Sequence, residues 1–94
     1  MGLKTYPFDA SEFLGSPESQ AELIDDALDT GDASYVAHAI GVVARARGMT
    51  EVARLTGLSR ESLYKALSAE GNPEFATILK VAKVLGIKIT AKAA

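Results

Sequence analysis

The chain has 94 residues, no cysteine and a formal net charge of −2 at pH 7. This length supports one domain with a modest core, and the lack of cysteine excludes disulfides and thiolate metal sites. The N-terminus carries no basic segment followed by an apolar one, and no apolar run reaches membrane-spanning length. We therefore expect a cytoplasmic protein that does not enter a membrane.

Charge is distributed unevenly along the chain. Through Ser34, one basic side chain stands against eight acidic ones, whereas from Tyr35 onward nine basic side chains stand against four acidic ones. An acidic front and a basic rear are compatible with a polyanionic partner for the rear portion. Ordinary solvated helix faces would give the same pattern, so charge alone leaves both interpretations open.

The first third of the chain predicts an arm, a helical turn and an acidic helix. A proline near the N-terminus favours an extended arm or an edge strand, and Asp9 is typical of a cap before one turn over residues 10–14. Ser16, followed by a proline, signals the start of a helix with apolar residues at helical spacing. Gly31 is expected to end this helix, whose carboxylates face mostly outward.

The next helix is expected to begin after Asp32 and to end at Gly48. Apolar residues form a stripe along it, as is usual for a helix with one buried face. Arg45 and Arg47 fall in its last turn, where cations interact favourably with the helix dipole.

Two short helices follow, separated by a glycine. Thr50 is expected to cap the first of them, which ends at Gly57, and Ser59 is expected to cap a second helix over residues 60–67. One longer helix would bury the same apolar residues, so the interruption itself needs a reason. A tight turn allows the second helix to stand at a large angle to the first and to project as a ridge.

A final helix is expected to begin at Asn72 and Pro73 and to end at Gly86, with Phe75 and Leu79 among its core-facing residues. Isoleucines then alternate with polar residues in the tail "IKITAKAA". This alternation predicts a short strand, paired with the N-terminal arm or with a second subunit.

The segment around the glycine break resembles the helix-turn-helix of the phage-repressor-like Xre family, which includes Cro. The framework residues that carry this resemblance are Ala53, Gly57, Leu58 and Leu63. The alanine lets two helices approach closely, the glycine permits a turn with positive φ, and the leucines anchor the second helix to the core. The resemblance implies an all-α, lambda-repressor-like domain of five helices, with short terminal β-strands as an additional feature.

A narrower resemblance covers nearly the whole chain. The segments "PFDASEFL", "ARARGMTEVARLTGLSRESLYKALS" and "GNPEFATILKVAKVLGIKI" are similar to those of addiction-module antidote proteins, HigA-like antitoxins encoded beside a RelE/ParE-type toxin. This resemblance implies an antitoxin of a type II toxin-antitoxin module that binds its toxin and represses its own operon. Residues 1–34 would form an arm and an acidic helix packed on the same domain. Residues 35–94 would form the helix-turn-helix DNA-binding domain and its tail.

The second helix of the motif is expected to enter the major groove of DNA. Its first turn, and the residues one turn later on the same face, would meet base edges. Arg60 could place its fork on a guanine, Glu61 could accept from a cytosine amino group, and Lys65 could reach a guanine or a phosphate. Tyr64 could contact a phosphate or a thymine methyl group. The alternatives are a solvated helix face for Arg60 and Lys65 and packing against a neighbouring helix for Tyr64.

Phosphate contacts are expected around the same motif. Thr50 and Ser59 lie at helix starts, where unpaired N–H groups suit phosphate oxygens. Arg54 lies on the outer face of the first motif helix, and a surface salt bridge is its alternative role. Ser62 and Asn72 complete the set of expected phosphate contacts.

Catalysis is disfavoured by the residues available. His38 is the only histidine, so a histidine metal site would need carboxylates from distant segments. Asp25, Asp26 and Asp29 are grouped too closely on one helix to take separate acid and base roles. A nucleophile, base and orienting group are not jointly visible, and neither a metal nor a cofactor is expected.

The leading hypothesis is therefore a sequence-specific repressor that acts as a homodimer on a palindromic operator in double-stranded DNA. One recognition helix touches only a few base pairs, so affinity at cellular salt would require two subunits. The acidic residues 9–31 would bind a basic toxin or screen the basic face. The alternative is a helical protein-interaction adaptor that has lost DNA binding, which the net negative charge favours.

Overall fold

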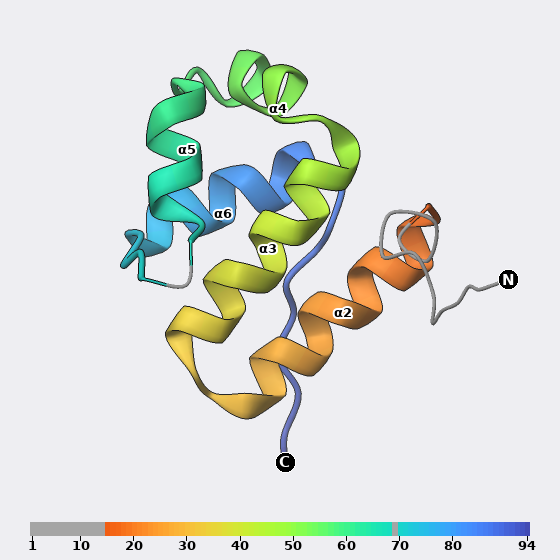
Figure 1. Ribbon diagram of the computed structural model, residues 1–94. Coiled ribbons are helices and arrows are strands. Elements are labelled where there is room, and N and C mark those ends of the chain that lie inside the picture. Colours follow the sequence, from red (N-terminus) through yellow and green to blue (C-terminus); the bar gives the residue numbers. More distant parts are fainter. Residues whose placement is uncertain (1–14, 69) are drawn as a thin grey trace, which may run out of the picture.

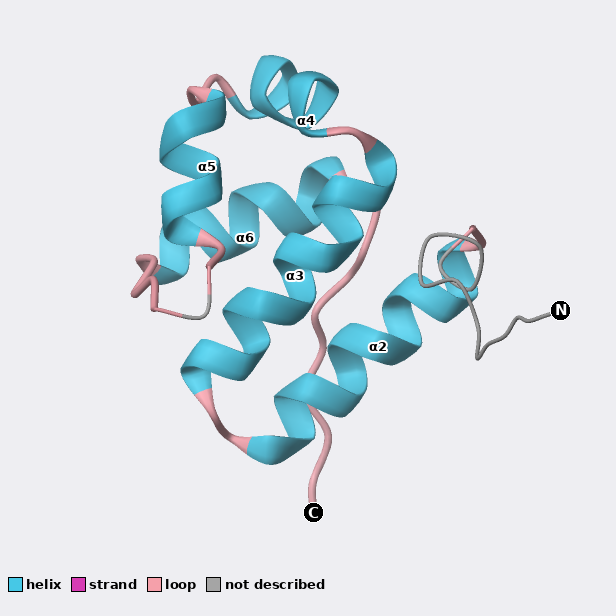
Figure 2. Ribbon diagram, viewed as in Figure 1, coloured by secondary structure: helices cyan, strands magenta, loops and turns pink. Residues whose placement is uncertain are grey.

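The computed structural model describes residues 15–68 and 70–94. Within these ranges the chain is all-helical, as predicted (Figures 1 and 2). The helices are α2 (Pro17–Thr30), α3 (Ala33–Arg47), α4 (Met49–Thr56), α5 (Arg60–Ala66) and α6 (Phe75–Val84). The N-terminal arm and the turn expected over residues 10–14 lie outside the described residues.

The boundaries of α2 and α3 follow the capping signals in the sequence. The Ser16 side chain accepts a hydrogen bond from the Ser19 N–H at 3.1 Å, and Gly31 ends α2 in the left-handed conformation. Asp32 then accepts the N–H groups of Ser34 and Tyr35 at the start of α3. These three predictions are confirmed. The two helices pack against each other as an antiparallel pair because the connection between them is so short.

The Asp32 carboxylate is held in its ionised form by its neighbours. The hydroxyl of Ser34, followed by the main-chain N–H groups of Tyr35 and Ser34, donates to it and lowers its pKa. A carboxyl group whose pKa is lower in the folded than in the unfolded chain contributes stability above the unfolded pKa. That contribution is lost as the pH falls through the lowered folded pKa.

We expect the free energy of unfolding to depend less on pH in the acid range for the variant Asp32→Asn than for the wild type. Asparagine keeps an acceptor for the helix cap but has no charge to titrate. The margin by which the wild type is more stable than the variant should therefore shrink as the pH falls below about 4. Thermal unfolding followed between pH 7 and pH 2 measures this margin, with Asp26→Asn as the matched control for the loss of one charge. A margin that stays constant over this range would contradict the prediction.

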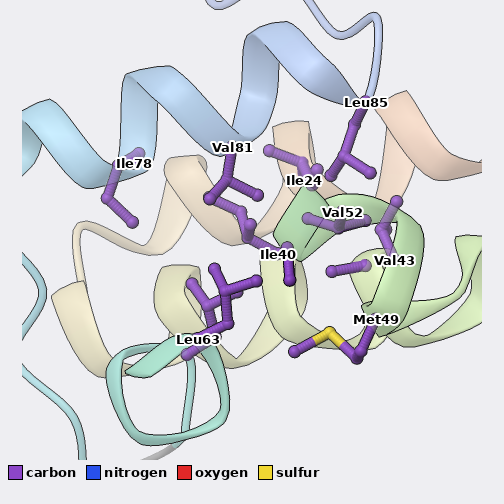
Figure 3. Close-up of a cluster of buried hydrophobic side chains, with 12 residues drawn as sticks. Ile24, Ile40, Val43, Met49, Val52, Leu63, Ile78, Val81 and Leu85 are labelled. Atoms are coloured by element: carbon purple, nitrogen blue, oxygen red, sulfur yellow. The ribbon is translucent and has the colours of Figure 1, made fainter. Parts of the chain in front are cut away.

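The core brings side chains from all five described helices together (Figure 3). α6 runs across α3 and α4, while α2 packs along α3. The residues labelled at the centre of the cluster in Figure 3 are Ile24, Ile40, Val43, Met49, Val52, Leu63, Ile78, Val81 and Leu85. Burial of these aliphatic side chains is the main favourable contribution to the fold.

Gly41 allows α3 to lie directly against the end of α5. A Cβ atom at this position would stand 2.6 Å from the main-chain oxygen of Leu67. Real Cβ atoms do not approach a carbonyl oxygen so closely, so only glycine fits without a shift of the main chain. The position of α5 is therefore fixed by a contact with the backbone of its last turn, in addition to buried leucines.

Arg47 joins three segments that are far apart in the sequence. Its Nε donates to the side-chain oxygen of Gln20 in α2 at 3.0 Å, and its Nη2 donates to the main-chain oxygen of Leu85 at 2.7 Å. The sequence placed Arg47 in the last turn of its helix, which is confirmed. Its larger role is to link α2, α3 and the end of α6.

We expect Arg47→Met to lower the free energy of unfolding by about 2 kcal/mol. Methionine retains most of the aliphatic stem but leaves the acceptors of Gln20 and Leu85 without their charged donor. Arg45→Met, in the same helical turn and with no hydrogen bond of this kind recorded among the described residues, is the matched control. Urea unfolding should show a large loss for the first variant and little change for the second. Equal losses would contradict this account of Arg47.

Two predicted helix starts are wrong. α4 begins at Met49, one residue before the predicted cap, because Met49 is buried in the core and the carbonyl of Gly48 accepts the Val52 N–H. Thr50 therefore lies within the first turn and makes no cap hydrogen bond. α6 begins at Phe75 and not at Asn72, because Glu74 is still extended and serves as the N-cap.

The buried face of α6 also differs from the prediction. Ile78, Val81 and Ala82 face the core, whereas Phe75 and Leu79 are exposed by 70% and 44%. The apolar stripe of α6 is wider than the surface that the other described helices cover. Helical spacing alone could not show which edge of that stripe would be left outside.

The predicted C-terminal strand is not observed in the part of the chain that the structure describes. Residues 87–94 are extended without a strand ladder (Figure 2). Ile87 and Ile89 pack against the core cluster, while Lys88 and Thr90 are exposed. The alternation in the sequence therefore reflects one buried face, and a buried face alone does not require a partner strand.

Candidate nucleic-acid interface

Residues 50–67 form two helices joined by a turn and not one continuous helix. Gly57 adopts φ 78° and ψ 10°, and its N–H donates to the Ala53 carbonyl at 2.9 Å, which ends α4. The Thr56 hydroxyl donates to the Val52 carbonyl at 2.8 Å and accepts the Leu58 N–H at 3.3 Å. The prediction of a break at Gly57 is confirmed.

Thr56 is a residue of this turn that sequence reasoning missed. Its side chain is 8% exposed and satisfies main-chain groups on both sides of the turn. The sequence did offer a signal, a threonine directly before the glycine that ends a helix. Its hydroxyl can donate a hydrogen bond to one of the last carbonyl groups of that helix. The predicted framework residues Ala53 and Leu63 are buried, and Leu58 packs against the core.

Ser59 caps α5 as predicted. Its Oγ accepts the Ser62 N–H at 3.0 Å, and its hydroxyl donates to the Ser62 Oγ at 2.9 Å. Both serines are exposed at the start of the helix. They therefore form one hydroxyl pair on the surface, next to the turn.

The outer face of α5 carries the four side chains expected to meet bases. Arg60, Glu61, Tyr64 and Lys65 are all exposed, whereas Leu63 between them is fully buried. The guanidinium carbon of Arg60 lies 5.8 Å from the centre of the Tyr64 ring, within the range of a cation–π contact. Tyr64 is thus not packed away between helices, and its ring stands beneath the Arg60 fork.

Arg54 forms a two-point ion pair within α4. Its Nη2 and Nε lie 2.5 Å and 3.2 Å from the two carboxylate oxygens of Glu51. The hydrogen bond from Arg54 lowers the pKa of the Glu51 carboxyl, which therefore stays ionised. The surface salt bridge that was the alternative role for Arg54 is present. A phosphate at this place would have to compete with Glu51 for the same guanidinium.

Three of the predicted contacts border one shallow hollow between α5 and the loop that precedes α6. Ser62, Lys65 and Asn72 line it together with Glu70. The structure thus brings these predicted residues close to one another. Thr50 is exposed in the first turn of α4. The acidic Glu70 would weaken the attraction of this hollow for a phosphate.

No three histidine, aspartate or glutamate side chains in residues 15–68 and 70–94 are grouped so that they could hold a metal ion. No helix in the same ranges has the length and apolar character needed to cross a bilayer.

Comparison with known proteins gives one family and one relative. A family model described as "Probable addiction module antidote protein" matches residues 4–93. The chain is 44% identical over 81 residues to an uncharacterized protein of Haemophilus influenzae, a match that covers 86% of this chain and 84% of the relative. No solved structure matches.

Proposed function

Because the chain belongs to the family of probable addiction module antidote proteins, we propose that it is an antitoxin that also represses its own operon. In this proposal α4, the turn and α5 form a helix-turn-helix of the lambda-repressor-like Xre type. The chain acts as a homodimer on a palindromic site in double-stranded DNA, and a RelE/ParE-type toxin is its protein partner. Its role is regulatory and not catalytic.

The observation that carries the DNA-binding part of the proposal is the division of α5 into two faces. Leu63 and the backbone near Leu67 fix the inner face against the core, while Arg60, Tyr64 and Lys65 stand exposed on the outer face. A short helix held in this way after a tight turn suits insertion into a major groove, where its first turns reach base edges.

Arg60 is proposed to contact a guanine through two parallel hydrogen bonds. The Tyr64 ring lies 5.8 Å from its guanidinium carbon and restricts the number of orientations that the fork can take before DNA arrives. Less side-chain entropy is then lost on binding. Glu61 would accept from a cytosine amino group, and Lys65 would reach a guanine or a phosphate.

Backbone contacts are proposed to come from the edges of the same surface. Ser59 and Ser62 offer hydroxyl groups beside the turn, and Thr50 offers a third near the start of α4. Arg54 would exchange one or both of its hydrogen bonds to Glu51 for hydrogen bonds to a phosphate. Asn72, in the loop before α6, would contact the DNA backbone. Such contacts set the position on DNA and carry no sequence information directly.

The acidic outer surface of α2 is proposed to meet the toxin. Five carboxylates on this helix are exposed, and its last turn holds no basic residue. They are Glu18, Glu22, Asp25, Asp26 and Asp29, of which Glu18, Asp26 and Asp29 lie outside the hollow between α2 and the C-terminal tail. A RelE-like toxin that holds RNA needs a basic surface, so opposite charges would favour this contact and speed the encounter.

The dependence of DNA binding on salt tests the repressor proposal. The chain and its labelled promoter are mixed at 50 mM and 200 mM salt, and retardation in a gel is measured. A repressor should lose affinity steeply, with a slope of about −0.9 in log–log form for each phosphate contact. A chain that causes no retardation at either salt concentration would be an adaptor that has lost DNA binding.

A separate measurement tests the toxin partner. The product of the adjacent reading frame is purified and titrated with the wild-type chain and with the double variant Asp26→Lys, Asp29→Lys, since neither aspartate lines the hollow beside the C-terminal tail. The proposal expects tight binding of the wild type and much weaker binding of the charge-reversed variant, because the basic toxin would now meet lysines. Equal binding of both chains would remove α2 from the proposed toxin surface.

A further inference from the structure

The C-terminal tail crosses the molecule between two helices and lies where three hollows meet. Ile87 and Ile89 are half-buried while Lys88 and Thr90 are exposed, so one face of the tail rests on the core. One hollow separates the tail from α2, and another separates it from α6. The third opens beyond Ile89 toward the start of α3. Figure 1 shows the tail as an extended run from the end of α6 past α3 and α2.

Large apolar side chains stand exposed around these hollows. Phe75 and Leu79 project from successive turns of α6, and Leu28, which is 39% exposed, projects from α2. Leu28 and Phe75 line the hollow beyond Ile89, and Leu79 lines the hollow beside α6. Grouped apolar exposure of this kind is typical of a surface that another molecule covers.

The two sides of the apolar surface formed by Leu28, Phe75, Leu79 and Ile89 differ in charge. On the α2 side the hollow is lined by Glu22 and Asp25, and on the α6 side it is lined by Lys83. Lys88 of the tail borders both hollows. A partner with a surface of one charge sign would be attracted on one side and repelled on the other. A second copy of the chain carries both signs in the required arrangement.

We propose that this surface binds a second copy of the chain in a symmetric dimer. Its apolar centre is formed by Leu28, Phe75, Leu79 and Ile89. With the two-fold axis parallel to the tail, the acidic α2 side of one copy faces the basic α6 side of the other. A two-fold axis that lies in the plane of the contact surface but runs perpendicular to the tail would place the acidic α2 of one copy against α2 of the other. Repulsion between like charges disfavours that arrangement.

This dimer surface deepens the proposed function, since it names the contact between the two copies that a palindromic operator needs. The dimer surface rests on the proposed function only in that a palindromic operator requires two copies of the chain. The geometry of the patch itself does not involve DNA. The contact can therefore be tested on the free protein.

Sedimentation equilibrium of the full chain without DNA measures the dimer dissociation constant. The variants Phe75→Asp and Leu79→Glu should each raise it by roughly 30-fold or more, because each places a charge at the centre of the apolar contact. Leu55→Glu, a change at a similarly exposed leucine on α4, is the matched control and should leave the constant unchanged. Circular dichroism confirms that each variant is folded.

A charge-exchange cycle tests the direction of the two-fold axis. Lys83→Glu and Asp25→Lys should each weaken the dimer by about two- to fivefold, and the two changes in one chain should restore it. A wild-type chain that is monomeric at all concentrations, or a Phe75→Asp variant that dimerises like the wild type, would overturn the dimer surface. If Phe75→Asp instead abolished toxin binding by a monomeric chain, the surface would belong to the toxin. Retention of DNA binding in any of these cases leaves the repressor part of the proposed function standing and removes only the dimer surface.

Discussion

Replacing Arg60 with alanine is expected to weaken binding to the operator by about 5- to 150-fold, with little change in binding to unrelated DNA. A bidentate contact from arginine to guanine contributes about 1–3 kcal/mol of discrimination against the wrong base. Arg60 is exposed and has no ion pair among the described residues, so its removal should leave the fold intact. Fluorescence anisotropy with operator and scrambled duplexes measures both affinities.

Variants of Tyr64 distinguish two possible roles of this residue. Its ring can hold the Arg60 guanidinium in place, or its hydroxyl can contact the DNA directly. Tyr64→Phe keeps the ring under the guanidinium and should retain specific binding, whereas Tyr64→Leu removes the ring and should lose part of it. If both variants bind like the wild type, the ring is not needed. If Tyr64→Phe alone is enough to lose binding, the hydroxyl itself contacts the DNA.

Arg54→Ala is the matched control for a contact to the DNA backbone. It should weaken binding to operator and scrambled duplexes by similar factors and reduce the salt slope by about one unit. An Arg60→Ala variant that behaved in the same way would show that Arg60 contacts phosphate and not a base. Unchanged operator binding after Arg60→Ala and Lys65→Ala together would remove the outer face of α5 from the DNA site.

Gly41→Ala is expected to be the most destabilising single methyl addition in the described part of α3. The new Cβ would stand 2.6 Å from the Leu67 oxygen, so α3 and the end of α5 would have to move apart. Overpacking against a rigid backbone costs about 2–3 kcal/mol. For a chain of this size the melting temperature should fall by roughly 10–20 °C. Differential scanning calorimetry measures the change.

The opposite sign is the general expectation for this substitution. Alanine is favoured over glycine within a helix by about 1 kcal/mol, so Gly41→Ala would stabilise an unhindered helix. Ala46→Leu, on the exposed side of α3, is a control for added volume without a close neighbour and should change stability by less than about 0.5 kcal/mol. A stabilised Gly41→Ala variant would show that the two helices can separate at no cost.

Local signals in the sequence predicted most of the helix boundaries. Ser16, Asp32 and Ser59 are followed by the helices that they were expected to cap, and Gly31 and Gly57 end helices in the left-handed conformation. These signals act within a few residues, because a side chain replaces a missing main-chain partner nearby. The break before α5, and the exposure of the side chains on its outer face, could be predicted for the same reason.

Features that depend on contacts between distant segments were not predictable. The start of α4 at Met49 depends on the burial of that side chain, and the exposure of Phe75 depends on how far neighbouring helices extend over α6. The roles of Gly41 and Arg47 arise from residues that lie 26 to 38 positions away in the sequence. A local pattern contains no information about such distances.

The partners of the predicted site residues were also visible only in space. The sequence left Arg54 between a phosphate contact and a salt bridge, and the structure shows the salt bridge with Glu51. It also left Tyr64 between a DNA contact and packing against a neighbouring helix, and the structure shows the ring exposed, 5.8 Å from the Arg60 guanidinium carbon. Side chains of this length can reach several neighbours, so their spacing along a helix does not choose among them.

The small size of α5 has a consequence for how such a protein can change over generations. The helix has 7 residues, and within it only Leu63 is buried. Most of its outward positions can be exchanged without disturbing the interior, so in the proposed DNA complex a new sequence preference would need no change to the scaffold. If α5 reads the operator as proposed, a few surface substitutions on this helix would suffice to direct each copy of a duplicated gene pair to its own promoter.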